Sequence, residues 1–245
     1  MPELVFAREE ELGEVRRRLA RRQPFLLHGP AGVGKTLLLK TLLPEFPQVL
    51  YCGDSTSVKG IFHALGSALV RAGDPYAAAG LGKGAKGLEH KSSVAIRGIV
   101  RDALRAASYV VVLDHAAGAS QALFSSIKEA VQSAATPVVA VSRSAHMEDL
   151  GFLLNLYPDR SDRLQIRNFD PATALAFARE GAAQSGLQAL NMAEFLERLV
   201  ELSQGNPGAI LALIEMARDP RYRSAERIKV TPLYIDFRLR WNAHA

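Results

Sequence analysis

The chain has 245 residues, 48% of them hydrophobic and 22% charged, and its formal net charge is +5. These values are ordinary for a soluble globular protein, and the length suits one large α/β domain, alone or beside a small helical one. No apolar run approaches the roughly twenty residues of a membrane span, no signal-peptide core is found, and the one cysteine, Cys52, permits no internal disulfide. We therefore expect a reducing, cytoplasmic location and no membrane partner.

In chain order, the first predicted elements are an amphipathic helix over residues 9–22 and a short buried strand, Phe25–His28. A loop comes next that matches the pattern G-x-x-x-x-G-K-[ST] at every position: Gly29-Pro30-Ala31-Gly32-Val33-Gly34-Lys35-Thr36. The apolar residues Leu37–Leu43 then predict a helix that stops at Pro44. A loop between a strand and a helix is the context that this phosphate-binding motif needs, which argues against a chance glycine-rich turn.

The loop carries the groups that bind a nucleoside triphosphate with Mg²⁺. Its glycines let backbone N–H groups surround phosphate oxygens, and the helix that follows points its N-terminus at them. The Lys35 ammonium can reach the β- and γ-phosphates, and the Thr36 hydroxyl is placed to bind Mg²⁺. The predicted nucleotide contacts in this segment are Gly29, Pro30, Ala31, Gly32, Val33, Gly34, Lys35, Thr36 and Leu37.

Apolar strands and helices alternate from residue 49 to residue 143. The strands are predicted at Val49–Cys52, Tyr109–Asp114 and Pro137–Arg143, and the helices at 61–72, 93–107 and 120–134. This alternation implies a parallel sheet covered on both faces, which is the three-layer α/β/α core of a P-loop NTPase.

Residues 77–91 contain few large apolar side chains and predict a mobile surface loop. Lys83, Lys86 and Lys91 make this loop basic, so it permits contact with nucleic acid or a partner, although a solvated loop explains the lysines as well.

Polar residues follow the predicted strands at their carboxyl ends, where ligands of open parallel sheets bind. Asp114 comes at the end of Val110–Leu113, and we predict that it helps Thr36 to hold Mg²⁺. A turn aspartate is the alternative, because aspartate favours such positions in any case. Ser142 and Arg143 are the last residues of the next predicted strand and are expected at the same edge.

The pattern becomes helical from Asp170, with helices predicted at 171–185, 191–204 and 207–218. We predict a core over residues 1–168, a helical lid domain over 169–220 and an extension over 221–245. Leu233, Ile235, Phe237, Leu239 and Trp241 alternate with polar or aromatic residues, and this period of two predicts a strand in the extension.

Several segments make the chain resemble the AAA+/STAND group of P-loop ATPases, especially its origin-recognition-like, transposition-helper and NB-ARC-like branch. In chain order they are Val5–Leu12, similar to the box before the first helix, Gly29–Thr36 (Walker A), Tyr109–Asp114 (Walker B), Ser142-Arg143 (sensor 1) and Gly205-Asn206-Pro207 (the G-x-P turn of the lid). The resemblance covers residues 5–218.

The resemblance implies a site assembled from these segments. Val5, Phe6 and Arg8 are expected near the adenine, Pro207 is expected to contact the nucleotide from the lid, and Ser142 or Arg143 to sense the γ-phosphate.

An arginine of a neighbouring subunit often completes the site in this family. Arg160 and Arg163 lie in the region where that arginine occurs, and a trans arginine stabilises charge on the transferring phosphoryl group. Two surface arginines paired with Asp159 and Asp162 explain the same segment equally well.

His115 stands where the family usually has a glutamate directly after the Walker B aspartate. Histidine can accept a proton near neutral pH, but it lacks the charge and geometry of a carboxylate. Hydrolysis is therefore expected to be slow, to use another residue, or to be absent.

The predicted function is an ATP-dependent molecular switch or assembly factor that slowly hydrolyses Mg-ATP to ADP and phosphate. ATP is preferred over GTP because no N-K-x-D sequence is present and the family favours adenine. The expected partners are ATP or ADP and a second copy or another protein. Two alternatives stay open: a DNA-associated helper, suggested by the basic balance, and a non-hydrolysing interaction module, suggested by His115.

Overall fold

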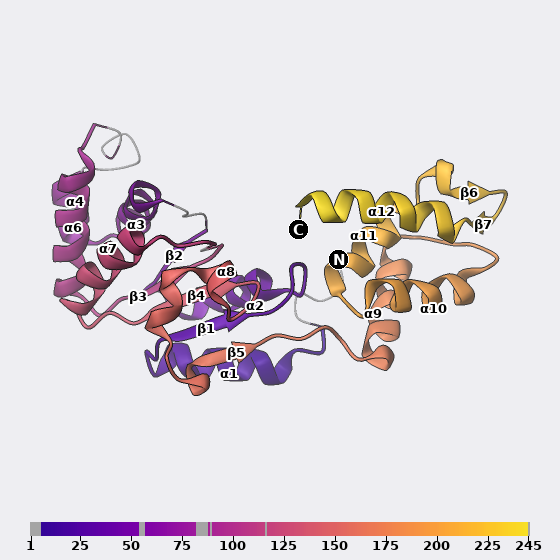
Figure 1. Ribbon diagram of the computed structural model, residues 1–245, viewed down its shortest axis with the longest axis horizontal. Helices are drawn as coiled ribbons and strands as arrows, with labels where there is room; N and C mark the ends of the chain where they lie inside the picture. Colours follow the sequence, from indigo (N-terminus) through magenta and orange to yellow (C-terminus); the bar gives the residue numbers. More distant parts are fainter. Residues whose placement is uncertain (1–5, 54–56, 82–87, 89, 116, 245) are drawn as a thin grey trace. The chain divides into compact units, whose positions relative to one another are not determined.

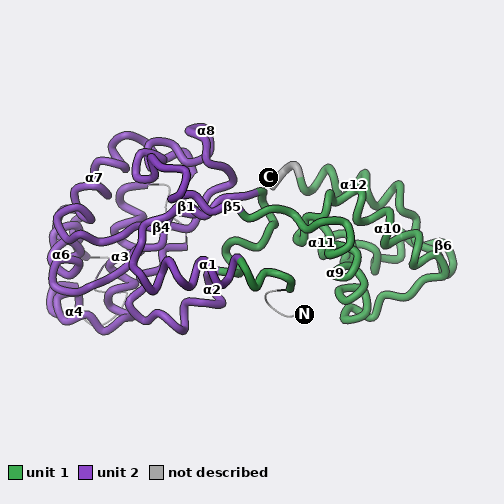
Figure 2. The backbone as a smooth tube through the Cα atoms, turned by 90° about the horizontal axis from the view of Figure 1, so that it is seen from below, with its two compact units in different colours: residues 1–10, 30–38, 166–245 green, residues 11–29, 39–165 purple. Residues whose placement is uncertain are grey.

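The computed structural model describes residues 6–53, 57–81, 88, 90–115 and 117–244 (Figure 1). The chain forms two compact units (Figure 2). We call residues 11–29 and 39–165 the sheet unit, and residues 1–10, 30–38 and 166–245 the helical unit. The glycine-rich loop is thus grouped with the helical unit, although β1, the strand before it, belongs to the sheet unit.

The sheet unit is built on a five-stranded parallel sheet with the strand order β2-β3-β4-β1-β5 (Figure 1). Its strands are β1 (Phe25–His28), β2 (Val49–Cys52), β3 (Val110–Leu113), β4 (Val138–Ser142) and β5 (Arg163–Gln165). The first four confirm the predicted strands. β5 escapes prediction because it is a three-residue edge strand with two polar side chains.

Helices cover both faces of the sheet, which confirms the predicted α/β/α core. Leu26, Val111 and Ala140 join the hydrophobic core made with α3, α6 and α7 on one face. On the other face, the Arg18 guanidinium of α1 lies 5.7 Å from the Phe25 ring, and Nζ of Lys40 in α2 lies 5.8 Å from the ring of Tyr51. The helices packed with the sheet are α1 (Glu9–Ala20), α2 (Lys35–Leu42), α3 (Val58–Arg71), α4 (Pro75–Leu81), α6 (Ser93–Ala106), α7 (Gln121–Gln132) and α8 (Met147–Leu150), with 3-10 turns at Leu43–Glu45, Phe152–Leu156 and Arg160–Asp162.

The loop predicted over residues 77–91 is wrong at its start, because α4 continues to Leu81. Asp74 caps this helix by accepting a hydrogen bond from the Ala77 amide at 2.8 Å, and alanines, which favour helices, follow. Leu81 and Leu88 are buried in the core beside Gly66. Among the lysines of that prediction, Lys83 and Lys86 lie outside the described residues, and Lys91 is exposed.

The helical unit contains the predicted helices as α9 (Pro171–Gln184), α10 (Met192–Ser203) and α11 (Pro207–Met216). A small hairpin, β6 (Arg223–Ser224) with β7 (Arg227–Ile228), precedes α12 (Val230–His244), and a 3-10 turn lies at Pro220–Tyr222. These elements share a second hydrophobic core, separate from that of the sheet. The domain limits at residues 168 and 220 stay a prediction.

The strand predicted within residues 233–241 is wrong, because these residues lie in α12. Leu233 and Phe237 recur at the helical spacing of four and are buried with the rest of the core. Ile235 and Leu239, which fit only the two-residue period, are left 55% and 70% exposed. Tertiary packing therefore selects the period of four over the equally visible period of two.

Within the described residues, no helix combines the length and the hydropathy needed to cross a membrane.

Candidate functional site

The glycine-rich loop leaves β1 at its carboxyl end and leads into α2. The Gly29 amide donates to the Ser142 carbonyl at 3.3 Å, which ties the start of the loop to the end of β4. Gly32 and Gly34 have φ of +77° and +101°, in a region that other residues rarely adopt. The glycines at these two positions are therefore required by the backbone of the loop.

The lysine and threonine of the motif form the first turn of α2. Nζ of Lys35 donates to the Pro30 carbonyl at 2.9 Å, so the ammonium folds back over its own loop. The Leu38 amide already donates to the Gly34 carbonyl at 2.9 Å, whereas the amides of Gly34 and Thr36 donate to no residue that the structure describes. A helix N-terminus with free amides and a lysine suits an anionic ligand.

The start of α11 contacts the glycine-rich loop directly, and both belong to the helical unit. The buried Asn206 donates from Nδ2 to the Ala31 carbonyl at 2.9 Å, and the Gly208 amide donates to the Gly32 carbonyl at 3.0 Å. A Cβ on Gly32 would lie 2.7 Å from Asn206 Oδ1 and 3.0 Å from Cη2 of Trp241, so only glycine fits there. Pro207 is the first residue of α11, within this contact.

Asn206, Gly208 and Trp241 are contact residues that sequence reasoning did not single out as functional. Asn206 and Gly208 flank the predicted Pro207, so the G-x-P turn was the available signal. Trp241 lay in the segment predicted as a strand, and its position beside Gly32 depends on α12 being a helix.

Asp114 is fully buried at the end of β3, and its carboxylate is held at both oxygens. Oδ2 accepts a hydrogen bond from the Tyr51 hydroxyl at 2.6 Å, and Oδ1 accepts one from the His115 amide at 2.9 Å. Each carboxylate oxygen can accept two hydrogen bonds or metal contacts, so each retains one free site. Tyr51 is a further residue that the sequence analysis missed.

His115 has a left-handed backbone, with φ of +58°, and its side chain is 67% exposed. Its Nε2 lies 3.8 Å from Asp114 Oδ1. A non-glycine residue with positive φ is uncommon and directs attention to its position. The imidazole is thus beside the buried carboxylate and open to solvent.

The other predicted site residues of the sheet unit, one serine and three arginines, differ in burial and in hydrogen bonding. Ser142 is buried and ends β4, and the exposed Arg143 follows it at the same edge as Asp114. Arg163 donates from Nε and Nη2 to the Tyr157 carbonyl at 3.1 and 2.9 Å, which occupies its guanidinium within its own chain. Arg160 is exposed, and no described aspartate or glutamate lies in ion-pair range of it.

Arg8 of the helical unit is buried, in contrast to most arginines. Its Nη2 donates to the Arg167 carbonyl at 2.6 Å, and its guanidinium lies 4.4 Å from the centre of the Phe169 ring. The Phe6 ring packs against Phe169 at 6.1 Å. Val5, predicted beside the adenine, lies outside the described residues.

Taken unit by unit, the glycine-rich loop fits the phosphates of a nucleotide, and Asp114 has the chemistry of a Mg²⁺ ligand. The left-handed glycines and free amides make a cradle for phosphate, and Asp114 keeps free oxygen sites in a buried setting. Among the described residues, no group of three acidic, histidine or cysteine side chains could hold a metal.

A scan against protein families matches the AAA domain over residues 17–166. The chain belongs to the AAA domain family. This match includes the glycine-rich loop and Asp114, and it confirms the resemblance to AAA+ P-loop ATPases. A comparison with curated proteins finds no match.

Solved structures share the fold. The Orc1 protein of Aeropyrum pernix, solved in complex with DNA, matches with a TM-score of 0.65 and 18% identity over 98% of this chain and 66% of that one. A Walker-type ATPase of Pyrococcus abyssi matches with a TM-score of 0.57 and 18% identity over 87% of this chain and 68% of that one. A STAND protein of Pyrococcus horikoshii with a tetratricopeptide repeat sensor matches with a TM-score of 0.51 and 15% identity over 97% of this chain and 33% of that one. The chain thus spans about two thirds of the first two proteins and a third of the last.

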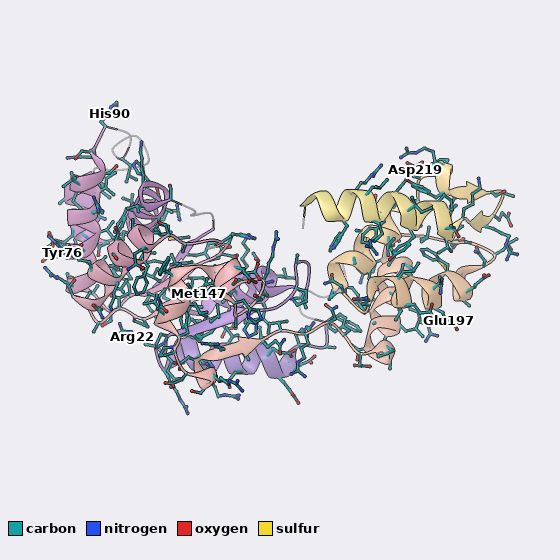
Figure 3. The ribbon with its side chains drawn as sticks, in the orientation of Figure 1. Arg22, Tyr76, His90, Met147, Glu197 and Asp219 are labelled. Carbon is teal, nitrogen blue, oxygen red and sulfur yellow. The ribbon has the colours of Figure 1, made fainter. Side chains whose placement is uncertain are left out.

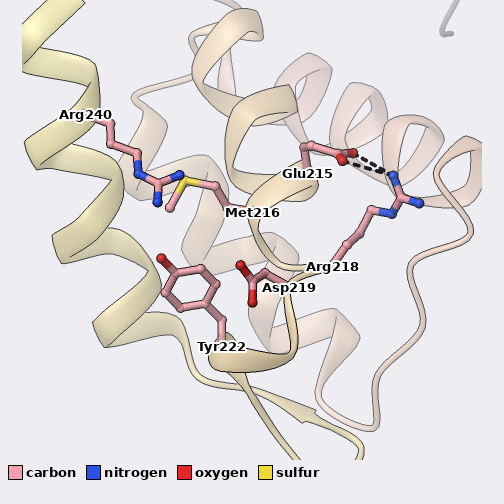
Figure 4. Close-up of a pocket in the computed structure, with 6 residues that line it drawn as sticks. All are labelled: Glu215, Met216, Arg218, Asp219, Tyr222 and Arg240. Carbon is pink, nitrogen blue, oxygen red and sulfur yellow. Dashed lines mark hydrogen bonds and ion pairs between the residues drawn. The ribbon is translucent and has the colours of Figure 1, made fainter.

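A separate pocket of about 510 Å³ lies within the helical unit (Figure 4). Three of its charged lining residues are in ion pairs: Arg218 Nη1 lies 2.8 Å from Glu215 Oε2, and Asp219 Oδ2 lies 2.7 Å from Nη2 of the neighbouring Arg221. None of the predicted site residues lines it; the lining residues are Glu215, Met216, Arg218, Asp219, Tyr222 and Arg240. The candidate residues therefore lie elsewhere: in the glycine-rich loop of the helical unit and, within the sheet unit, at the carboxyl ends of the strands.

Proposed function

We propose that this AAA-family protein binds ATP with Mg²⁺ and acts as a nucleotide-dependent switch or assembly factor that hydrolyses ATP slowly. The observation that carries the proposal is the glycine-rich loop itself, which has the complete motif, left-handed backbone at Gly32 and Gly34, and α11 docked on its carbonyls. A ligand that fills this loop acts on the same backbone that Asn206 and Gly208 hold. Nucleotide binding therefore has a direct route to the helical unit.

Each predicted residue has a role in this proposal. Lys35 leaves the Pro30 carbonyl and neutralises the β- and γ-phosphates, while the loop amides bind phosphate oxygens. Thr36 and Asp114 would hold Mg²⁺, which screens the charge of the phosphates and helps to orient them. Ser142 or Arg143 responds to the γ-phosphate, and Arg8 and Pro207 contribute from the helical unit.

His115 is the residue on which hydrolysis depends in this proposal. Its imidazole is exposed and lies 3.8 Å from the Asp114 carboxylate, which supports a role as acceptor of a proton from water. The imidazole lacks the negative charge of a glutamate, which is why we propose slow turnover.

Arg160 is the better candidate for an arginine that acts in a neighbouring subunit. It is exposed, whereas Arg163 is occupied by the carbonyl of Tyr157. The alternative that both arginines pair with the flanking aspartates gains no support, since the structure describes no such ion pair.

Phosphate release from Mg-ATP per protomer, measured over a range of protein concentrations, tests the proposal. We expect specific activity to rise with concentration, because a site completed between subunits needs assembly. Arg160→Ala should abolish that rise, and Arg163→Ala is the matched control that should retain it. Bound ATP without any phosphate release would make the protein a switch that holds nucleotide, and no ATP binding would overturn the proposal.

A DNA-associated role is the second candidate, favoured by the formal charge of +5. The Orc1 protein with a similar fold was solved with DNA, but that observation concerns Orc1. In this chain, the Arg101 guanidinium lies 3.7 Å from Asp102 and 4.0 Å from Glu129, which lowers its availability to phosphates. Binding to duplex DNA that weakens steeply with added salt would support this role, and no binding at low salt would exclude it.

A non-hydrolysing interaction module is now motivated by His115 alone. The strand predicted in the extension would have offered such a module an edge for a partner, but the residues form α12, whose Leu233 and Phe237 are buried within the helical unit.

A further inference from the structure

Tyr51 stands where the sheet directs a side chain toward Asp114. It pairs in register with Val112 on β3, and Asp114 comes two residues after Val112. Side chains two residues apart on a strand point to the same face, so Tyr51 and Asp114 are diagonal neighbours on the face that α2 covers. The contact follows from strand register, and the 2.6 Å hydrogen bond is its result.

The ring of the half-buried Tyr51 has two identified neighbours, Gly53 and Lys40. A Cβ on Gly53 would lie 3.1 Å from Cε1 of this ring, so the chain passes close over it. Nζ of Lys40 lies 5.8 Å from the ring, on the helix that the glycine-rich loop begins.

The two hydrogen bonds to Asp114 set the plane of its carboxylate. The His115 amide alone would hold one oxygen and let the group rotate about χ2; the Tyr51 hydroxyl holds the other oxygen and stops that rotation. One acceptor site remains on each oxygen, in a fixed direction. Groups that orient a metal-binding carboxylate in this way commonly matter nearly as much as the ligand itself.

We propose that Tyr51 is a positioning residue for Mg²⁺-dependent nucleotide binding, and that it acts through Asp114. The inference rests on the proposed function, because it requires Asp114 to serve the Mg²⁺ that accompanies ATP. The inference adds to the predicted site a residue on β2, whereas the residues predicted so far are those of the glycine-rich loop, the aspartate after β3 and the arginines.

The test measures nucleotide affinity rather than turnover. Binding of a non-hydrolysable ATP analogue is followed by calorimetry in EDTA and across a Mg²⁺ titration, for the wild type and Tyr51→Phe. We expect Tyr51→Phe to match the wild type in EDTA and to need roughly tenfold more Mg²⁺ for half of the Mg²⁺-dependent gain in affinity, the lower end of the effect of such supporting groups.

Tyr109→Phe is the matched control, because it also removes a tyrosine hydroxyl from a buried aspartate, at 2.9 Å from Asp74 Oδ2. It should leave the Mg²⁺ requirement unchanged, and thermal unfolding of both variants checks that they fold. On the Asp114→Asn background, Tyr51→Phe should add nothing, because the two residues act as one unit.

The outcomes separate the inference from the function on which it rests. A Mg²⁺ requirement of Tyr51→Phe equal to that of the wild type would overturn the inference, as would an equal shift in Tyr109→Phe or a shift that persists without Asp114. A wild type that binds the analogue equally well in EDTA and Mg²⁺ would remove the role of Asp114. A wild type that binds no analogue would overturn the proposed function itself.

Discussion

At both ends of the parallel strands, a tyrosine hydroxyl donates a hydrogen bond to a buried aspartate. We call these two ends the carboxyl edge and the amino edge of the sheet. At the carboxyl edge, Tyr51 donates to Asp114, and at the amino edge, Tyr109 donates to Asp74. Asp114 is 0% and Asp74 2% exposed. Burial, with help from the aspartate, raises the pKa of both phenols, that of Tyr109 to about 12, so both hydroxyls keep their protons and donate at neutral pH.

The pairs differ in what the second carboxylate oxygen does. Asp74 Oδ1 accepts from the Ala77 amide and so caps α4. At the same edge, Arg22, labelled in Figure 3, donates a hydrogen bond from Nη2 to the Tyr109 carbonyl at 3.2 Å. Asp114 Oδ1 instead accepts a hydrogen bond from the amide of His115, the next residue, whose backbone is left-handed. The amino-edge pair therefore supports a helix of the fold, whereas the carboxyl-edge pair includes the aspartate that we propose to bind Mg²⁺.

The largest expected difference between the edges comes from Lys35→Ala. The ammonium is expected to bind the phosphates, and a charge-assisted contact of this kind contributes enough to weaken nucleotide binding on the order of 100-fold when removed. The unfolding free energy should change little, because the half-buried side chain donates to a carbonyl of its own loop, that of Pro30. Calorimetric titration with ATP measures the affinity, and wild-type affinity in the variant would refute the assigned site.

The residues proposed to function at the carboxyl edge could be predicted from the sequence, and there is a physical reason for this. The glycine-rich motif and the aspartate after Val110–Leu113 carry their chemistry in local order, and buried parallel strands are continuous apolar runs. The role of Tyr51 could not be predicted from the sequence, because it depends on the register between β2 and β3. No local sequence pattern determines that register.

The helical unit shows the same limit of local patterns. α9, α10 and α11 follow from periodicity and from the Pro and Gly residues at their ends, and the structure confirms them. α12 satisfied two periods at once, and only burial against the other helices decided between them. The contact of Trp241 with the glycine-rich loop could not be predicted until that choice was made.

Asp74→Ala should produce the next largest effect, on stability alone. It removes the cap of α4 and leaves the Tyr109 hydroxyl without its acceptor, which together cost about 2–3 kcal/mol of unfolding free energy. Nucleotide affinity should stay within twofold of the wild type. Urea unfolding measures the first quantity and ATP titration the second.

Asp114→Asn is the counterpart that sharpens the comparison. The amide keeps the shape of the side chain: its oxygen can accept from the His115 amide, and its NH2 group can donate to the Tyr51 hydroxyl oxygen. The variant should therefore lose Mg²⁺-dependent affinity and retain most of its stability. If instead Asp74→Ala weakened ATP binding and Asp114→Asn only destabilised the protein, the roles assigned to the two edges would be exchanged.

His115→Gly should have the smallest effect on stability, and its sign is informative. A left-handed backbone strains a non-glycine residue by roughly 1–2 kcal/mol, while glycine adds unfolded-state entropy that offsets part of the relief, so a net gain of up to about 1 kcal/mol is expected. Phosphate release should fall if the imidazole accepts the proton. Higher stability with lower turnover would mean that His115 serves hydrolysis at a cost in stability. Strained backbone is often found at active sites for this reason. Unchanged turnover in the variant would separate His115 from hydrolysis and leave Asp114, positioned by Tyr51, as the functional group of this edge.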